Sequence, residues 1–134
     1  GIDIISIRSE ALKTVNGKRG KKTHGISNPI MGKFRKGQKV LIIDDVVASL
    51  AHTKESAIDF LHGAGLKIIP LICVVVDREE GGKETLRKKG YDLFSILKFK
   101  KILKLYLEKS LINEDYHKKS LRYSRIAKKY ALKK

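Results

Sequence analysis

The 134-residue chain lacks the features typical of disulfide-stabilised and membrane-spanning proteins. Its one cysteine, Cys73, has no partner for an internal disulfide and no second residue at metal-ligand spacing. Because Cys73 stands in an apolar run, we expect it to be a small core residue. No apolar run approaches the ~18–20 residues that a membrane span requires, and no basic and apolar leader opens the chain. We therefore expect a soluble, cytoplasmic protein of one domain with no membrane partner.

The chain also has few acidic residues, 14 Asp+Glu against 30 Lys+Arg, which gives a formal charge of +16. Residues 1–39 have a net charge of +8, residues 40–97 of −2 and residues 98–134 of +10. Basic flanks favour polyanions, either nucleic acid or phosphorylated small molecules, and lysine-rich composition also occurs without a binding role. The charge leaves these three interpretations open. The sequence shows no recognition helix, aromatic stacking platform or Cys/His cluster that would support nucleic-acid binding specifically.

Strand and helix signals alternate along the chain. β-Branched residues at 2–7 predict a strand, and the Lys-, Gly- and Asn-rich stretch 8–39 predicts a long loop or a hairpin. Residues 39–43 predict a strand buried on both faces, which ends at Asp44-Asp45. Residues 67–76 predict a second buried strand, with Pro70 at an edge or at the strand's start. Helices are expected at 53–64 and 83–89, and a third strand at 91–96.

The C-terminal part predicts two helices, at 99–108 and 113–134. The helix at 113–134 is basic and amphipathic, with Leu121, Ile126, Ala127 and Tyr130 on or near one face. We expect this helix to pack on its own domain. The alternative is that it forms a surface for nucleic acid or for a partner. The order of elements implies βαβ units, and hence an α/β fold with a parallel sheet. Ligands of such sheets bind beyond the carboxyl ends of the strands, where Asp44-Asp45 and Asp77-Arg78 stand.

Adjacent carboxylates at that edge suit two kinds of ligand. They accept hydrogen bonds from ribose hydroxyls, and Mg²⁺ prefers oxygen ligands. An acidic pair that caps the next turn is the alternative.

Four ordered motifs resemble those of a known family. The run VLIIDDVVAS from Val40 to Ser49 resembles the phosphoribosyl-diphosphate (PRPP) motif of type I phosphoribosyltransferases. Three further segments are similar to the orotate phosphoribosyltransferase family: SIRSE at 6–10 with KKTHG at 21–25, VDREEGG at 76–82, and GYDLFSIL at 90–97. The resemblance covers about residues 1 to 110. It implies a type I phosphoribosyltransferase domain at 1–110, with a catalytic-type loop at 8–39, and a basic C-terminal helix of the same domain at 111–134.

The resemblance implies transfer of the phosphoribosyl group of PRPP to orotate, which gives orotidine 5′-monophosphate and diphosphate, a step in pyrimidine synthesis. Lys22, His24 and Arg8 would lie over the diphosphate and reach into a neighbouring subunit's site, which implies a homodimer. Asp44 and Asp45 would hold the ribose hydroxyls, and Arg78 the orotate. We expect Lys22, His24 and Asp45 to be catalytic, and Mg²⁺ to be held mainly by PRPP. A solvated basic loop is the alternative for Lys22 and His24.

The phosphate loop departs from the family pattern. It comprises Ala48, Ser49, Leu50, Ala51 and His52. Ala48 lacks the usual hydroxyl, and Leu50 replaces a glycine, where a Cβ in a left-handed conformation costs about 1–2 kcal/mol. Ser49, His52 and the N–H groups of the next helix can still bind phosphate, although an exposed His52 without such a role is the alternative.

The resemblance begins at the strand before the catalytic-type loop, so we expect this chain to be the C-terminal half of the family's domain, with an exposed sheet edge. The alternative function is that of a non-catalytic relative, which binds PRPP or a nucleotide as a regulator and contacts nucleic acid through its basic flanks. A third interpretation is a basic interaction module that keeps only the fold.

Overall fold

A computed structural model describes residues 4–7, 30–48 and 52–133, with the side chains of 52–56 left out. It divides into two compact units. Unit 1 comprises Gly1–Val40 and His52–Ile68, and unit 2 comprises Leu41–Ala51 and Ile69–Lys134. No helix in the described ranges is long and apolar enough to cross a membrane.

Unit 1 contains a short antiparallel strand pair and a helix. Strands β1 (Ser6–Ile7) and β2 (Ile30–Met31) pair in antiparallel fashion, with Ser6 opposite Met31. Helix α2 (His52–Gly63) buries Ala57, Ile58 and Leu61 at the predicted helical spacing. The turn before β3 is tied to the turn after α2, since the Gly37 N–H donates to the Gly65 carbonyl at 2.7 Å.

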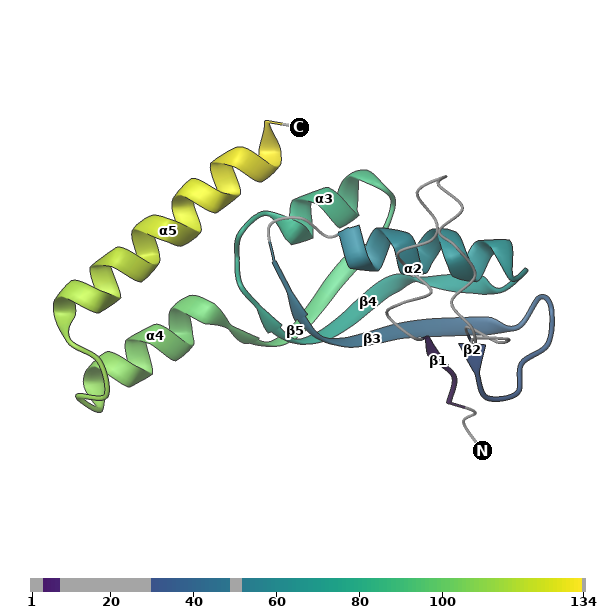
Figure 1. The fold of residues 1–134 in the computed structure, drawn as a ribbon, viewed down its shortest axis with the longest axis horizontal. Helices are drawn as coiled ribbons and strands as arrows, with labels where there is room; N and C mark the ends of the chain where they lie inside the picture. Colours follow the sequence, from purple (N-terminus) through teal and green to yellow (C-terminus); the bar gives the residue numbers. More distant parts are fainter. Residues whose placement is uncertain (1–3, 8–29, 49–51, 134) are drawn as a thin grey trace, which may run out of the picture. The chain divides into compact units, whose positions relative to one another are not determined.

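The sheet has the order β3 (Lys39–Val47), β4 (Lys67–Asp77) and β5 (Asp92–Lys98), as Figure 1 shows. Strands β4 and β5 are parallel, with Ile72 opposite Leu93. Ile72 is fully buried, and Val74 and Leu93 are buried beside it. Pro70 lies in the central strand rather than at an edge. It precedes Leu71, where the pairing with β5 begins, so its missing N–H removes no hydrogen bond from that register. The predicted α/β fold with a parallel sheet is confirmed.

Two details of the strand prediction are wrong. Strand β3 does not end at Asp44-Asp45 but continues through both acids to Val47. It is also not buried on both faces, because Leu41 and Ile43 are exposed while their neighbours in the strand are half-buried. Cys73 is likewise half-buried rather than in the core. The sheet therefore has one covered face and one open face.

Three helices complete unit 2: α3 (Gly82–Lys88), α4 (Phe99–Glu108) and α5 (Glu114–Leu132). Helix α3 contacts β5 and α5, and α4 contacts the same two elements (Figure 1). The packing of α5 on its own unit, expected from the sequence, is confirmed. Of the expected inner face, Leu121 and Ala127 are half-buried, but Ile126 and Tyr130 are exposed, and the buried residues are instead Ser124 and Ala131.

Candidate functional site

The carboxyl ends of β3 and β4 meet in unit 2. The Arg78 N–H, just beyond β4, donates to the Val47 carbonyl at the end of β3, at 3.0 Å. Gly82 then packs against the residue that follows β3, because a Cβ at position 82 would lie 2.3 Å from the Ala48 carbonyl oxygen. The structure thus brings two predicted site segments, the one with Asp44, Asp45 and Ala48 and the one with Arg78, to the same edge of the sheet.

The acidic pair lies within β3, before the strand's last two residues. Asp44 is half-buried and Asp45 is exposed, and the Asp45 N–H donates to Asp44 Oδ1 at 2.8 Å. Because successive residues of a strand point to opposite faces, the two carboxylates cannot occupy one side of the sheet. One of them can face a ligand while the other points to the opposite side.

Arg78 is partly held by a carboxylate of its own loop. Its Nη2 lies 2.7 Å from Glu80 Oε1, and Glu80 is only 2% exposed. No hydrogen bond reaches that oxygen in the described part of the chain, so the ion pair is what compensates its burial. The Arg78 side chain itself is 39% exposed, so the ion pair does not bury it, and a guanidinium is suited to bind a carboxylate or phosphate.

The loop from Asp77 to Gly82 has a defined backbone. Buried Asp77 accepts from the Glu79 N–H at 2.8 Å, and Glu79 takes a positive φ of 56°. The Glu79 carboxylate then accepts from the first turn of α4, where its Oε2 lies 3.1 Å from the Lys100 N–H. These contacts fix the path of the chain on both sides of Arg78.

Helix α5 supports the same loop from the other side. The buried Ser124 hydroxyl donates to the carbonyls of Arg78 and Glu79 at 3.4 and 3.5 Å. Gly81 has a φ of 103°, and a Cβ there would lie 3.0 Å from the Ala131 Cβ, so this contact requires glycine on one side and a small residue on the other.

An ion pair joins α5 to α3. Lys128 Nζ donates to Glu84 Oε1. Partial burial raises the pKa of Glu84, but the hydrogen bond and positive charge of Lys128 outweigh it, so that the pKa lies below its ordinary value.

Several predicted site residues lie outside the described ranges: Arg8, Lys22, His24, Ser49, Leu50 and Ala51. The backbone of His52 begins α2, but its side chain is not described. The roles assigned to these residues stay predictions. Sequence reasoning did not identify Glu80, Ser124 or Gly82 as residues that shape the site. The Gly81-Gly82 pair was the available signal for a close backbone approach.

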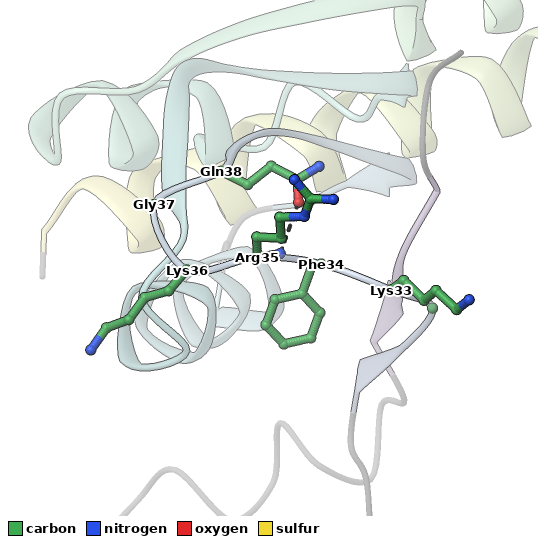
Figure 2. A pocket seen from close by; sticks show the side chains of 7 residues that line it. Lys33, Phe34, Arg35, Lys36, Gly37 and Gln38 are labelled. Atoms are coloured by element: carbon green, nitrogen blue, oxygen red, sulfur yellow. Dashed lines mark hydrogen bonds between the residues drawn. The ribbon is translucent and has the colours of Figure 1, made fainter.

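A separate pocket lies in unit 1. It has a volume of about 1050 Å³ and is lined by residues 32–38, which include Lys33, Arg35 and Lys36. Figure 2 shows these side chains around the turn, with the Arg35 N–H donating to Gln38 Oε1 at 3.0 Å. The pocket contains none of the predicted site residues, and its basic lining belongs to the positively charged N-terminal flank.

The described residues form no cage for a metal ion. No group of three or more His, Cys, Asp or Glu side chains comes together in the ranges that the structure covers. A divalent cation near Asp44 and Asp45 would therefore need ligand oxygens from a bound substrate in addition to those of the protein.

The comparison with known families agrees with this arrangement. A family model described as "Phosphoribosyl transferase domain" matches residues 10–107, which include β3, α2, β4, α3 and β5. The chain belongs to this family.

Within this family, the chain is similar to orotate phosphoribosyltransferases and to UMP synthases. An orotate phosphoribosyltransferase of Methanocella arvoryzae is 36% identical over 110 residues, which are 77% of this chain and 62% of that protein. The uridine 5′-monophosphate synthase of Bos taurus is 34% identical over 98 residues, 73% of this chain and 20% of that one. Among solved structures, the UMP synthase of Leishmania donovani superposes with a TM-score of 0.67 at 34% identity, and covers 72% of this chain and 21% of that one.

The relatives are longer than this chain. The matched part is 62% of the Methanocella protein and 48% of the orotate phosphoribosyltransferase of Thermoplasma acidophilum, so the chain spans about half the length of such relatives. This agrees with the C-terminal half of the domain that the motifs predict.

Proposed function

We propose that this chain supplies the PRPP- and orotate-binding edge of an orotate phosphoribosyltransferase. In the proposed reaction the bond between the anomeric carbon of PRPP and its diphosphate oxygen breaks, and a bond from that carbon to a ring nitrogen of orotate forms. The diphosphate departs with the bonding electron pair, and the orotate ring nitrogen loses its proton to solvent or to the departing diphosphate. The protein's part is to position the two reactants and to stabilise the charge on the leaving group.

The hydrogen bond between the Arg78 N–H and the Val47 carbonyl is the observation that carries this proposal. It joins the strand with the acidic pair to the strand that ends at Arg78. A phosphoribosyl donor held at Asp44 and Asp45 and a carboxylate-bearing acceptor held at Arg78 would then be neighbours at one edge. The names of the relatives support orotate as that acceptor.

The proposed roles follow from the chemistry of each group. One carboxylate of the Asp44-Asp45 pair would accept hydrogen bonds from the ribose hydroxyls, while the other points to the opposite side of the sheet. The guanidinium of Arg78 would bind the orotate carboxylate. The segment 48–52 would bind the 5′-phosphate, and Lys22, His24 and Arg8 would stabilise the diphosphate, in a homodimer with shared sites. Mg²⁺ would be held mainly by PRPP oxygens and would neutralise diphosphate charge.

Calorimetric titration of the chain with PRPP in the presence of Mg²⁺ tests the first part of the proposal. We expect saturable heat, and we expect Asp44→Asn with Asp45→Asn to weaken binding roughly 10- to 100-fold, since a hydrogen bond to a charged group contributes about 1.5–3 kcal/mol. Asp59→Asn, an exposed acid of α2, is the matched control for loss of charge. No heat from the unaltered chain would refute PRPP binding.

Orotate-dependent release of diphosphate tests the second part. It is measured on the chain joined to the unmatched part of a relative, because the chain spans about half the length of such relatives. We expect this protein to turn over PRPP and orotate. We expect Arg78→Lys to raise the KM for orotate more than the KM for PRPP. If PRPP binds but orotate releases no diphosphate, the non-catalytic regulator becomes the better interpretation.

A further inference from the structure

Three exposed tyrosines form a row on helix α5. Tyr116, Tyr123 and Tyr130 are 57%, 60% and 70% exposed. They are seven residues apart, which is about two helical turns, so they lie along one side of the helix. Ile126, which is 45% exposed, stands three residues after Tyr123 and four before Tyr130, and therefore extends the same side. We call these four side chains the tyrosine row.

The helix packs on its own unit through a different side. Its buried residues are Ser124 and Ala131, and its main contacts are with α3 and α4. Ser124 follows Tyr123, and successive residues of an α-helix point about 100° apart, so the buried side and the tyrosine row are separate. Within the described ranges the row is left against water. Exposed aromatic and apolar residues gathered on one face indicate an interaction surface.

Positive charge borders the tyrosine row. Arg122 and Lys129 are exposed and immediately precede Tyr123 and Tyr130. The acids of α5 and of the neighbouring helix α3 are already paired with other lysines: Glu114 with Lys118, Asp115 with Lys119, and Glu84 with Lys128. In the described part of the chain no acid is paired with Arg122 or Lys129, so their charge is available to a partner.

The spacing of the row fits a second helix. Two helices pack along a seam of apolar residues at heptad positions a and d, and charges at positions e and g set the choice of partner. With the tyrosines at position a, Ile126 is at d, and Arg122 and Lys129 are at g. Helix α5 has 19 residues, about 28 Å, which provides a seam of more than two heptads. Tyrosine and arginine are among the residues that contribute most of the binding energy in interfaces.

We infer that the tyrosine row and its two cations bind an acidic amphipathic helix of a partner protein. The apolar seam of that helix would lie on the row, and its carboxylates would face Arg122 and Lys129. The sign of the partner follows from the charge of residues 98–134, which is +10. No part of the proposed reaction is needed for this surface, since α5 begins at Glu114, beyond the residues 10–107 that the family model matches.

Two other occupants fit the row less well. A second copy of α5 would bring the same cations to the border, and its own acids are already paired. The homodimer proposed above assigns its shared residues to the loop at 8–39 and not to this helix. A nucleic-acid strand would meet the cations, but the tyrosines are about 10.5 Å apart along the helix axis, whereas stacked bases rise by about 3.4 Å.

The experiment titrates the full chain with a synthetic peptide of three heptads, with Leu at positions a and d and Glu at e and g. Like charges at e and g keep this Glu peptide from pairing with itself. A second peptide with Gln at e and g tests the role of charge, and single-stranded oligouridylate tests nucleic acid as the occupant. Sedimentation of the chain alone tests a second copy.

Tyr123→Gln tests the row. We expect it to weaken binding of the Glu peptide roughly tenfold or more, as for a residue at the centre of an interface. Tyr106→Gln changes a 43% exposed tyrosine of α4 outside the row, and it should change binding by less than about twofold. The midpoint of urea unfolding should be the same in both variants as in the unaltered chain, since both side chains are exposed.

A second pair of variants tests the charged border. Arg122→Gln with Lys129→Gln should weaken binding of the Glu peptide roughly three- to tenfold, because each exposed ion pair contributes modestly, and should leave binding of the Gln peptide within about twofold. Lys101→Gln with Lys109→Gln removes two exposed lysines in and just after α4 and is the control.

Absence of saturable binding of the Glu peptide would overturn the inference, and so would equal affinity for the Glu and Gln peptides. Equal loss in Tyr123→Gln and Tyr106→Gln would show that the row is not the contact. Oligouridylate binding that Tyr123→Gln abolishes would assign the row to nucleic acid instead. A dimer of the chain that the same variant dissociates would assign it to a second copy.

Discussion

The backbone of Ala48 stands so close to Gly82 that a single added carbon at position 82 would lie 2.3 Å from the Ala48 carbonyl oxygen. The same added carbon would lie 2.6 Å from Val47 Cγ2. The end of β3 and the start of α3 are therefore in direct backbone contact, and this contact holds the acidic strand beside the loop that carries Arg78. A side chain at position 82 would have to separate them.

Gly82→Ala is expected to destabilise the protein by about 1–3 kcal/mol, because the clash is with backbone and cannot be relieved by a side-chain rotation. We also expect it to weaken PRPP binding. Urea unfolding and calorimetry measure the two effects. Gly63→Ala is the control, since nothing lies within 4 Å of its added carbon and the helix should gain up to about 1 kcal/mol. Unchanged stability in Gly82→Ala would contradict the close contact.

Removal of Arg78 should destabilise the protein, because it leaves the buried Glu80 carboxylate without its ion-pair partner. We expect Arg78→Ala to lower the free energy of unfolding by about 1–3 kcal/mol, since it leaves a carboxylate that is only 2% exposed without its partner. Glu80→Gln removes the charge, so the double variant should recover part of the loss. A double-mutant cycle by urea unfolding measures the coupling. Strictly additive effects would show that the two side chains do not depend on each other.

The ion pair between Glu84 and Lys128 predicts a pH dependence. The pKa of Glu84 is lowered in the folded state, so its contribution to stability is present above the ordinary value of 4.5 and is lost as the pH falls through the lower folded value. Both side chains are more than a third exposed, which limits the contribution to about 0.2–1 kcal/mol.

In Lys128→Met, the free energy of unfolding should therefore fall less steeply as the pH drops below about 4.5. Unfolding measured between pH 3 and pH 7, roughly the window in which carboxylates titrate, provides the comparison. Lys129→Met, an exposed lysine of the same helix, removes the same charge without the ion pair. If both variants flatten the curve equally, general charge rather than this pair is responsible.

The sequence predicted the strands and helices well because their signals are local. Helix α4 has the predicted bounds of 99–108, and the strand signals at 39–43 and 67–76 fall within β3 and β4. What could not be predicted is which face would be covered. An uninterrupted apolar run such as that of β3 is typical of a strand between two layers, and the run itself does not tell whether both layers are present.

The sequence could predict only those parts of the site whose residues lie in the motifs near the carboxyl ends of β3 and β4. The strand with Asp44 and Asp45 does meet the Arg78 segment at the expected edge, but the ion pair between Arg78 and the buried Glu80 has no signal in the local sequence. Hydropathy placed Ile126 and Tyr130 on the inner face of α5. The close approach of Gly81 instead requires a small residue at Ala131, and the buried Ser124 hydroxyl donates to the carbonyls of Arg78 and Glu79.

The contact of α5 with the Arg78 loop gives the last prediction. Ser124→Ala removes a buried hydroxyl that donates to the carbonyls of Arg78 and Glu79, and we expect a loss of about 0.5–1 kcal/mol, since the bonds are long. Hydrogen–deuterium exchange should show faster exchange of the amides between Asp77 and Gly82, because the loop loses its support from the helix. Ser120→Ala, one turn earlier on the half-buried side of α5, is the control. A loop whose exchange is the same in the two variants would mean that α5 packs beside the site without holding it.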